Sequence, residues 1–154
     1  MYLPGRTRSG PRLTRTVRCV VSEVTARTSG NQAILEVSSA DGSVVAERVL
    51  LAAKPRQRLV GLLGRRGLEP GGGILLRRTG SIHMFFMRFA IDAVFLDRDD
   101  TVVKIVPDLK PWRLAAARRA KSVLEIGAGE CAARGLAVGD VLQTTPASPE
   151  ATDA

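Results

Sequence analysis

The chain has 154 residues, of which 45% are hydrophobic and 25% charged, and its formal net charge is +8. This length is enough for a single domain with a hydrophobic core. No run approaches the ~18 apolar residues of a membrane-spanning helix, and the basic N-terminus lacks the apolar stretch of a secretory signal. Two distant cysteines, Cys19 and Cys131, predict neither a disulfide framework nor a zinc site. We therefore expect a cytoplasmic single-domain protein with no bound metal, and composition alone indicates no reaction.

The positive charge is concentrated at the N-terminus. Five arginines and no acidic residue lie among residues 1–18. Residues 1–16 are polar and contain a Gly-Pro pair, so they are predicted to form a disordered basic arm. Such an arm can bind nucleic acid or an acidic membrane surface; the alternatives are a solvated tail or a start codon assigned too far upstream. The folded domain is expected to span 17–145, and 146–154 is expected to be a disordered tail.

Short apolar segments rich in β-branched residues predict nine strands. In chain order these strands are 17–25, 33–37, 44–51, 74–76, 82–88, 93–97, 102–106, 122–126 and 140–143. Two short helices are expected, one from Pro55 to about Gly64 and one over 130–134. The crossover helices of a parallel sheet are absent. The predicted fold is therefore a β-rich α+β domain of mainly antiparallel strands, like a barrel or a sandwich.

Two glycine-containing segments resemble cofactor loops. Residues 123–129 read VLEIGAG, as in the strand and glycine loop of a methyltransferase or a dinucleotide-binding domain. That loop normally opens a doubly wound domain, but only 25 residues follow Gly129. The run at 71–73 lacks the Lys-Ser/Thr of a P-loop. We interpret both segments as structural turns and predict no cofactor.

The segment 81–92 has the densest chemistry, because it contains the single histidine and three of the four phenylalanines. As a strand, it would place alternate residues on opposite faces. One face would carry His83, Phe85 and Met87, and the other Met84, Phe86 and Arg88. We expect Arg88 and Asp92 to pair across a bend near Ala90. The alternative interpretation is a central strand whose aromatic residues fill the core.

Several motifs occur in a fixed order: 58–65 (RLVGLLGR), 82–97 (IHMFFMRFAIDAVFLD), 110–113 (KPWR) and 123–129 (VLEIGAG), followed by Gly135-Leu136 and Gly139-Asp140. Together they resemble the motifs of the domain of unknown function 192 family. The resemblance covers about Ile34 to Leu142. It implies a compact β-rich domain and no reaction. The chain departs from the family pattern at Ala90, Met84 and Gly80, where proline, threonine and cysteine are common.

The leading functional hypothesis is a small accessory or binding domain with a polar pocket. Its candidate residues are Arg58, Arg65, His83, Arg88 and Asp92. Guanidinium groups match carboxylates and other anions, so the expected partner is a small anionic ligand, a carboxylate-bearing ligand or a peptide. One alternative is a hydrolase with His83 as general base and Asp92 orienting it, although the sequence shows no nucleophile or metal set.

The second alternative is weak, nonspecific nucleic-acid binding through basic patches. Two clusters lack local acids: Lys54, Arg56, Arg58, Arg65 and Arg66, and Lys110, Arg113, Arg118, Arg119 and Lys121. Single-strand binders interleave such residues with aromatic side chains. Only Trp112 lies near either cluster in the sequence, so this alternative ranks below ligand binding.

Overall fold

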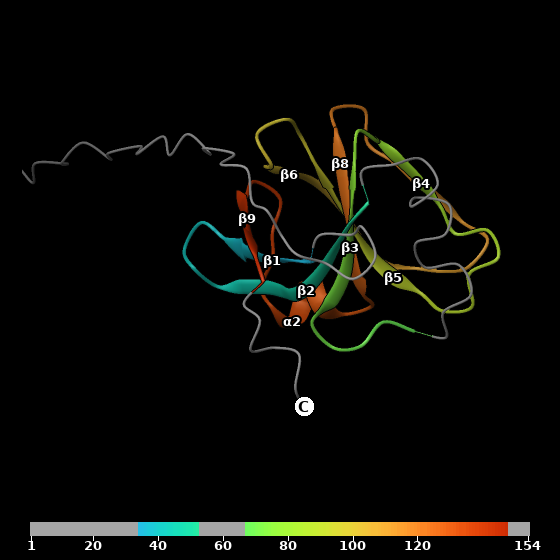
Figure 1. The fold of residues 1–154 in the computed structure, drawn as a ribbon. Coiled ribbons are helices and arrows are strands. Elements are labelled where there is room, and N and C mark those ends of the chain that lie inside the picture. The colour runs from blue at the N-terminus through green and yellow to red at the C-terminus, as the bar shows by residue number, and fades with distance from the viewer. Residues whose placement is uncertain (1–33, 53–66, 148–154) are drawn as a thin grey trace, which may run out of the picture.

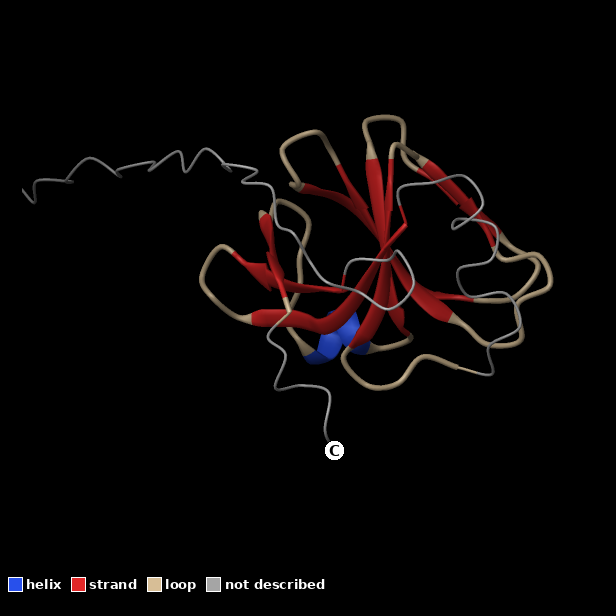
Figure 2. Ribbon diagram, in the orientation of Figure 1, coloured by secondary structure: helices blue, strands red, loops and turns tan. Residues whose placement is uncertain are grey.

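The computed structural model describes residues 34–52 and 67–147, and strands dominate this part of the chain (Figures 1 and 2). The strands are β1 Ile34–Ser39, β2 Val44–Ala52, β3 Gly72–Arg77, β4 Ser81–His83, β5 Ile91–Leu96, β6 Val102–Leu109, β7 Leu114–Ala116, β8 Ser122–Gly127 and β9 Leu142–Pro146. One helix, α2 Glu130–Ala133, lies between β8 and β9. The β-rich single-domain prediction is confirmed. The basic arm, the strand at 17–25 and the helix beginning at Pro55 fall outside the described residues.

Seven strands form one mixed sheet in the order β6-β5-β8-β3-β2-β1-β9. Neighbouring strands are antiparallel except β2 and β3, which are parallel. The outer strands β6 and β9 approach each other at one bridge, between Thr101 and Val141. Because no ladder joins them in the described ranges, the sheet does not close into the barrel that was one of the expected forms. β4 and β7 pair separately as a two-stranded sheet.

The two faces of the large sheet carry separate hydrophobic cores. The first core joins the sheet to β4, β7 and their loops, and it contains Ile74, Leu76, Ile82, Met84, Met87, Ala93, Phe95, Leu109, Ala115 and Val123. The second core lies on the opposite face against α2, and it contains Val37, Val49, Leu75, Val94, Leu124, Ile126, Cys131 and Leu142. β5 is buried along its whole length because alternate residues enter the two cores. This two-sided burial explains its unbroken apolar sequence.

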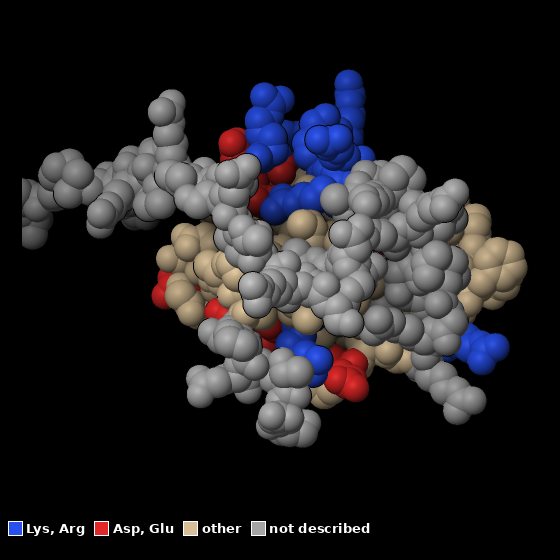
Figure 3. Space-filling view, viewed as in Figure 1, with Lys and Arg blue, Asp and Glu red and all other residues tan. Residues whose placement is uncertain are grey.

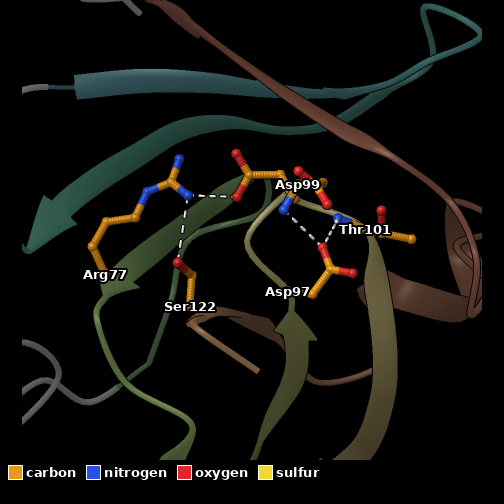
Figure 4. A network of polar contacts seen from close by, with 6 residues as sticks. Arg77, Asp97, Asp99, Thr101 and Ser122 are labelled. Atoms are coloured by element: carbon orange, nitrogen blue, oxygen red, sulfur yellow. Dashed lines mark hydrogen bonds and ion pairs between the residues drawn. The ribbon is translucent and has the colours of Figure 1, made fainter. Parts of the chain in front are cut away.

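Polar contacts hold the turn between β5 and β6 against the end of β3 (Figure 4). Arg77 donates hydrogen bonds to the Asp100 carboxylate and to Ser122 Oγ. The Asp97 carboxylate accepts from the backbone amides of Asp99 at 2.9 Å and Thr101 at 3.0 Å. Residues 97–100 therefore form a tight acidic turn. The Asp97 side chain organises its backbone, and the Asp100 side chain pairs with Arg77.

Candidate functional site

The chain leaves the strand conformation directly after His83, where β4 ends. The Met84 carbonyl accepts hydrogen bonds from the amides of Trp112 at 2.9 Å and Met87 at 3.3 Å, and the Met84 amide donates to the Arg113 carbonyl. Met84 and Met87 are both buried in the first core. The expected strand over 82–88, with Met84 and Met87 on opposite faces, is therefore wrong. A turn allows two flexible methionines three residues apart to fill the same core.

This turn and the loop before β7 bring four rings together at the surface. The ring centroids of His83 and Phe85 lie 5.1 Å apart in a stacked pair. Trp112 lies 6.0 Å from Phe85 and meets Phe86 edge-on at 5.0 Å. Leu114 is the cross-strand partner of His83. We call these five residues the aromatic ridge.

The aromatic ridge exposes large apolar side chains to solvent. Phe86 is 70% exposed, Trp112 61% and Leu114 69%. Contiguous exposed apolar side chains on a soluble domain mark interaction sites. Phe86 and Trp112 also have left-handed backbones, with φ of 65° and 64°. Aromatic residues rarely adopt this conformation, and strained backbones cluster at binding and catalytic sites.

The segments that form the aromatic ridge are uniformly basic. Residues 81–91 and 110–114, which carry the aromatic ridge, contain three basic residues and no Asp or Glu: Arg88, Lys110 and Arg113. All three are exposed. Lys110 makes a loose 3.8 Å ion pair with Asp108, and both side chains are mostly solvated. Three further basic residues, Arg118, Arg119 and Lys121, lie in the loop from β7 to β8, beyond the opposite end of the β4–β7 pair, and basic side chains gather above this loop (Figure 3). An acidic partner is therefore favoured at this surface.

Asp92 has a structural role in β5. Its side chain is fully buried, and its carboxylate accepts three backbone hydrogen bonds. The donors are the amides of Asp108 at 2.9 Å, Gly129 at 3.1 Å and Cys131 at 3.0 Å. These contacts fix β6 and the glycine turn of residues 127–131 on one carboxylate. The turn amides that resemble a cofactor loop are thus used within the fold, and the predicted strand, turn and short helix are present.

The structure separates the residues of the predicted pocket. His83 and Arg88 are exposed, on β4 and on the following turn. In the described part of the chain, no hydrogen bond or ion pair joins Asp92 to His83 or Arg88. The expected pairing of Arg88 with Asp92 is therefore not observed. Arg58 and Arg65 lie outside the described residues.

The described residues offer little to a hydrolase. Cys131 is buried in the second core, and burial together with the neighbouring Asp92 carboxylate raises the pKa of its thiol to about 12. A thiol protonated at neutral pH is a poor nucleophile. No group of three or more metal-ligating side chains occurs among residues 34–52 and 67–147.

No helix in these ranges is long and apolar enough to cross a membrane.

The sequence-based reasoning missed two features of this region. Phe86, Trp112 and Leu114 were not predicted as a surface patch, because Phe86 lies in an apolar run and Trp112 and Leu114 lie on a separate segment that the sequence does not place beside it. Glu125, in the middle of β8, is 9% exposed, and burial raises the pKa of its carboxyl group to about 7. In the sequence, Glu125 is a single acidic residue inside an apolar strand. We interpreted its segment, 123–129, by its glycines and did not single out the acid.

The model of the domain of unknown function 192, described as an uncharacterized ACR, matches residues 35–144. The chain belongs to this family. A UPF0127 protein of Pyrococcus furiosus is 36% identical over 117 residues, which is 75% of this chain and 92% of the relative. A UPF0127 protein of Pyrococcus horikoshii is 38% identical over 91 residues, which is 58% of this chain and 70% of the relative.

Two solved structures of similar fold come from bacteria. A crystal structure from Sinorhizobium meliloti, described as a "putative transcription regulator", has a TM-score of 0.66 and 27% identity. The match covers 77% of this chain and 98% of the Sinorhizobium meliloti chain. A protein of unknown function from Novosphingobium aromaticivorans has a TM-score of 0.62 and 25% identity, covering 73% of this chain and 84% of its own. The family and its structural relatives establish the fold of this domain and leave its activity open.

Proposed function

We propose that this protein is a binding module whose aromatic ridge takes an extended acidic peptide segment with apolar side chains. The observation that carries the proposal is the exposure of Phe86, Trp112 and Leu114 on one surface. Binding energy at protein interfaces is concentrated in a few large side chains, and tryptophan is the most enriched of them. Covering these three residues removes apolar area from water, which favours association.

Charge selects the acidic class of partner. Three basic and no acidic residues lie in residues 81–91 and 110–114, which carry the aromatic ridge. Exposed guanidinium groups at Arg88 and Arg113 are suited to carboxylates, which they bind through paired hydrogen bonds. Carboxylates of the partner would therefore lie beside the aromatic ridge while its apolar side chains cover Phe86 and Trp112. The proposal narrows the expected anionic ligand to a peptide. A peptide is favoured over a small molecule because the aromatic ridge is an exposed surface.

The ring geometry favours a peptide over single-stranded nucleic acid. Base stacking needs open ring faces. Phe85 is stacked on His83, and Phe86 meets Trp112 edge-on, so the rings occupy part of one another's faces. Leu114 adds an aliphatic surface that suits an apolar side chain. The description of the Sinorhizobium meliloti relative concerns transcription, so an oligonucleotide belongs in the test.

The single tryptophan supplies a direct assay, because Trp112 is exposed in the unbound protein. A synthetic peptide of alternating Glu and Leu should shift the Trp112 emission to the blue in a saturable way. A matched peptide of alternating Lys and Leu has the same apolar content and the opposite charge. It should leave the emission unchanged. Phe86→Ala keeps the fluorophore and should weaken the binding of the Glu-Leu peptide by about tenfold or more.

Val138→Ala is the matched control, because Val138 is an exposed apolar residue at 63% that lies in the turn after α2. It should bind the Glu-Leu peptide like the wild type. Equal binding of the two peptides, or equal loss in Phe86→Ala and Val138→Ala, would contradict a specific acidic partner. Tighter binding of oligothymidylate than of the Glu-Leu peptide would replace the proposal with nucleic-acid recognition.

A further inference from the structure

The outer edge of β7 points backbone groups away from the rest of its sheet. In an antiparallel pair, consecutive residues direct their amide and carbonyl groups alternately toward the neighbouring strand and away from it. The Arg113 carbonyl, just before β7, accepts from the Met84 amide at 2.8 Å, and the Ala117 amide, just after β7, donates at 2.9 Å into the loop before β4. Leu114 and Ala116 therefore direct their backbone groups away from β4.

Three of these outward groups are open to a partner. In the described ranges, no hydrogen bond involves the Leu114 amide, the Leu114 carbonyl or the Ala116 amide. The Ala116 carbonyl accepts from Lys104 Nζ at 3.0 Å, and both residues are exposed. A carbonyl oxygen has two lone pairs, so it can accept a second donor. An exposed strand edge of this kind is a template for pairing with another chain.

The outer edge of β4 is less suited to a partner strand. Ser81 and His83 direct their backbone groups away from β7, because they are the cross-strand partners of Ala116 and Leu114. The Thr79 hydroxyl donates to the Ser81 carbonyl at 2.8 Å and accepts from the Ser81 amide at 3.4 Å. One side chain therefore occupies both outward groups of Ser81. The β7 edge is the more open edge of this two-stranded sheet.

A strand added to β7 would continue the aromatic ridge. Leu114 and its cross-strand partner His83 lie on the exposed face of the two-stranded sheet, whereas Ala115 faces the first core. Side chains alternate along a strand, so every second side chain of the added strand would lie on the exposed face beside Leu114. A partner with alternating apolar and acidic residues matches this arrangement.

Positive charge surrounds the same edge. Arg113 lies directly before β7, and Arg118 and Arg119 follow it in the next turn. Lys104 reaches the edge from β6. All four side chains are exposed, and none forms an ion pair among the described residues. Two copies of this edge would repel each other, which favours an acidic partner over self-association.

We propose that the acidic partner binds as an additional β-strand on the outer edge of β7, through backbone hydrogen bonds to Leu114 and Ala116. This inference rests on the proposed function and adds the binding mode at the same surface. Apolar side chains of the partner extend the aromatic ridge, and its acidic side chains contact the basic residues around β7. Recognition then requires an extended segment with unsubstituted backbone amides, and it tolerates changes in the exact sequence.

N-Methylated peptides test this binding mode on the wild-type protein. The alternating Glu-Leu peptide is prepared in two further forms, one N-methylated at every Glu and the other at every Leu. In an extended peptide the amides of the two sets point to opposite edges, and only one edge faces β7. We expect one form to lose about tenfold or more in affinity, measured by Trp112 emission, and the other to bind like the unmethylated peptide.

Ala116→Pro removes one outward amide and leaves every residue of the aromatic ridge in place. Proline is tolerated at a strand edge whose amide has no partner, so the fold should be retained, as checked by circular dichroism. The affinity for the Glu-Leu peptide should fall about tenfold. Ala116→Val is the matched control, because it keeps the amide and suits a strand, and it should bind like the wild type. If Ala116→Pro does not fold, the methylated peptides decide alone.

The outcomes separate this inference from the proposed function. Failure of the unmethylated peptide to bind contradicts the proposed function and this inference with it. Binding of that peptide with equal affinities for the two methylated forms, or equal affinities of folded Ala116→Pro and Ala116→Val, overturns strand pairing and leaves binding at the aromatic ridge intact. A wild-type dimer in sedimentation equilibrium that dissociates in Ala116→Pro would assign the β7 edge to a second copy and would also overturn the proposal.

Discussion

Two acidic side chains are buried on adjacent strands of the same sheet, and they differ in their surroundings. Asp92 of β5 enters the second core and accepts three backbone hydrogen bonds. Glu125 of β8 lies between Ile74 and Ala93, so it enters the first core, and it has no partner among the described residues. Burial alone therefore does not define the role of an acid. A carboxylate saturated by the backbone holds the fold together, whereas a buried one without partners destabilises the folded protein when it is ionised.

The largest expected effect is at the saturated carboxylate. Asp92→Ala leaves the amides of Asp108, Gly129 and Cys131 without their acceptor; the Cys131 bond is buried and the other two are partly buried, and hydrogen bonds to a charged acceptor are worth about 1.5–3 kcal/mol each. We expect a loss of about 3–5 kcal/mol in the free energy of unfolding, measured by denaturant titration. Asp99→Ala, in the exposed turn, is the matched control and should lie within about 0.5 kcal/mol of the wild type. If Asp92→Ala lost no more stability than the control, Asp92 would have no structural role.

The unpartnered carboxyl predicts a pH dependence of stability with a definite sign. Burial raises the pKa of Glu125 from 4.5 to about 7, so the unfolded chain releases this proton at lower pH than the folded protein. The contribution to stability is complete below pH 4.5 and is lost as the pH rises through 7. A shift of this size corresponds to about 3 kcal/mol between pH 4 and pH 8.

Glu125→Gln isolates that contribution. The difference in the free energy of unfolding between wild type and variant should change by about 3 kcal/mol from pH 4 to pH 8, in favour of the variant at pH 8. Denaturant titrations at several pH values measure it. A difference that does not vary with pH would show that Glu125 is solvated or already paired in the folded protein.

The strained aromatic ridge predicts a smaller effect. Phe86 has φ of 65°, a conformation that costs residues with a side chain about 1–2 kcal/mol relative to glycine. Phe86→Gly should therefore be more stable than Phe86→Ala by about 1 kcal/mol, because both remove the ring and only glycine relieves the backbone. Thermal denaturation of the two variants provides the comparison. If alanine were the more stable replacement, the left-handed backbone would not be a feature of the folded protein.

The smallest effects are expected at the polar residues of the aromatic ridge. His83 and Arg88 are exposed, and in the described ranges neither contacts Asp92. His83→Ala and Arg88→Ala should each change the free energy of unfolding by about 0.5 kcal/mol or less. The denaturant midpoints of these two variants are compared with the midpoint of Asp92→Ala. A loss in Arg88→Ala as large as that in Asp92→Ala would restore the buried pair that the sequence predicted.

Much of the large sheet could be predicted from the sequence. β5 and β8 are buried on both faces, so each appears as a continuous apolar run bounded by polar turns. Asp41-Gly42, a dipeptide typical of hairpin turns, joins β1 and β2, and Gly42 has φ of 91°. These signals are local, because burial and turn conformation act on consecutive residues. The two-stranded sheet was harder, because β7 has three residues and no distinct pattern.

The candidate sites depend on contacts between segments that are far apart in the chain. Local sequence patterns do not predict such contacts. The turn after His83 forms because Met84 bonds to Trp112 and Arg113, almost thirty residues away. Asp92 was predicted to pair with Arg88, four residues away, but its acceptor capacity is used by amides at 108, 129 and 131. Glu125 lies in a segment that was recognised by its glycines. Its lack of a partner becomes visible only when Ile74 and Ala93 are placed beside it.

The pairing of β1 with β9 has a consequence for how the protein is made on the ribosome. β1 contacts β2 on one side and β9 on the other, and residues 34–39 and 142–146 are separated by nearly the whole domain. Until residue 146 has emerged, one edge of β1 carries unpaired amides and carbonyls, which can pair with another nascent chain. Completion of the sheet must therefore follow synthesis of almost the entire domain. A nascent chain arrested before β9 would expose this edge and be prone to aggregation.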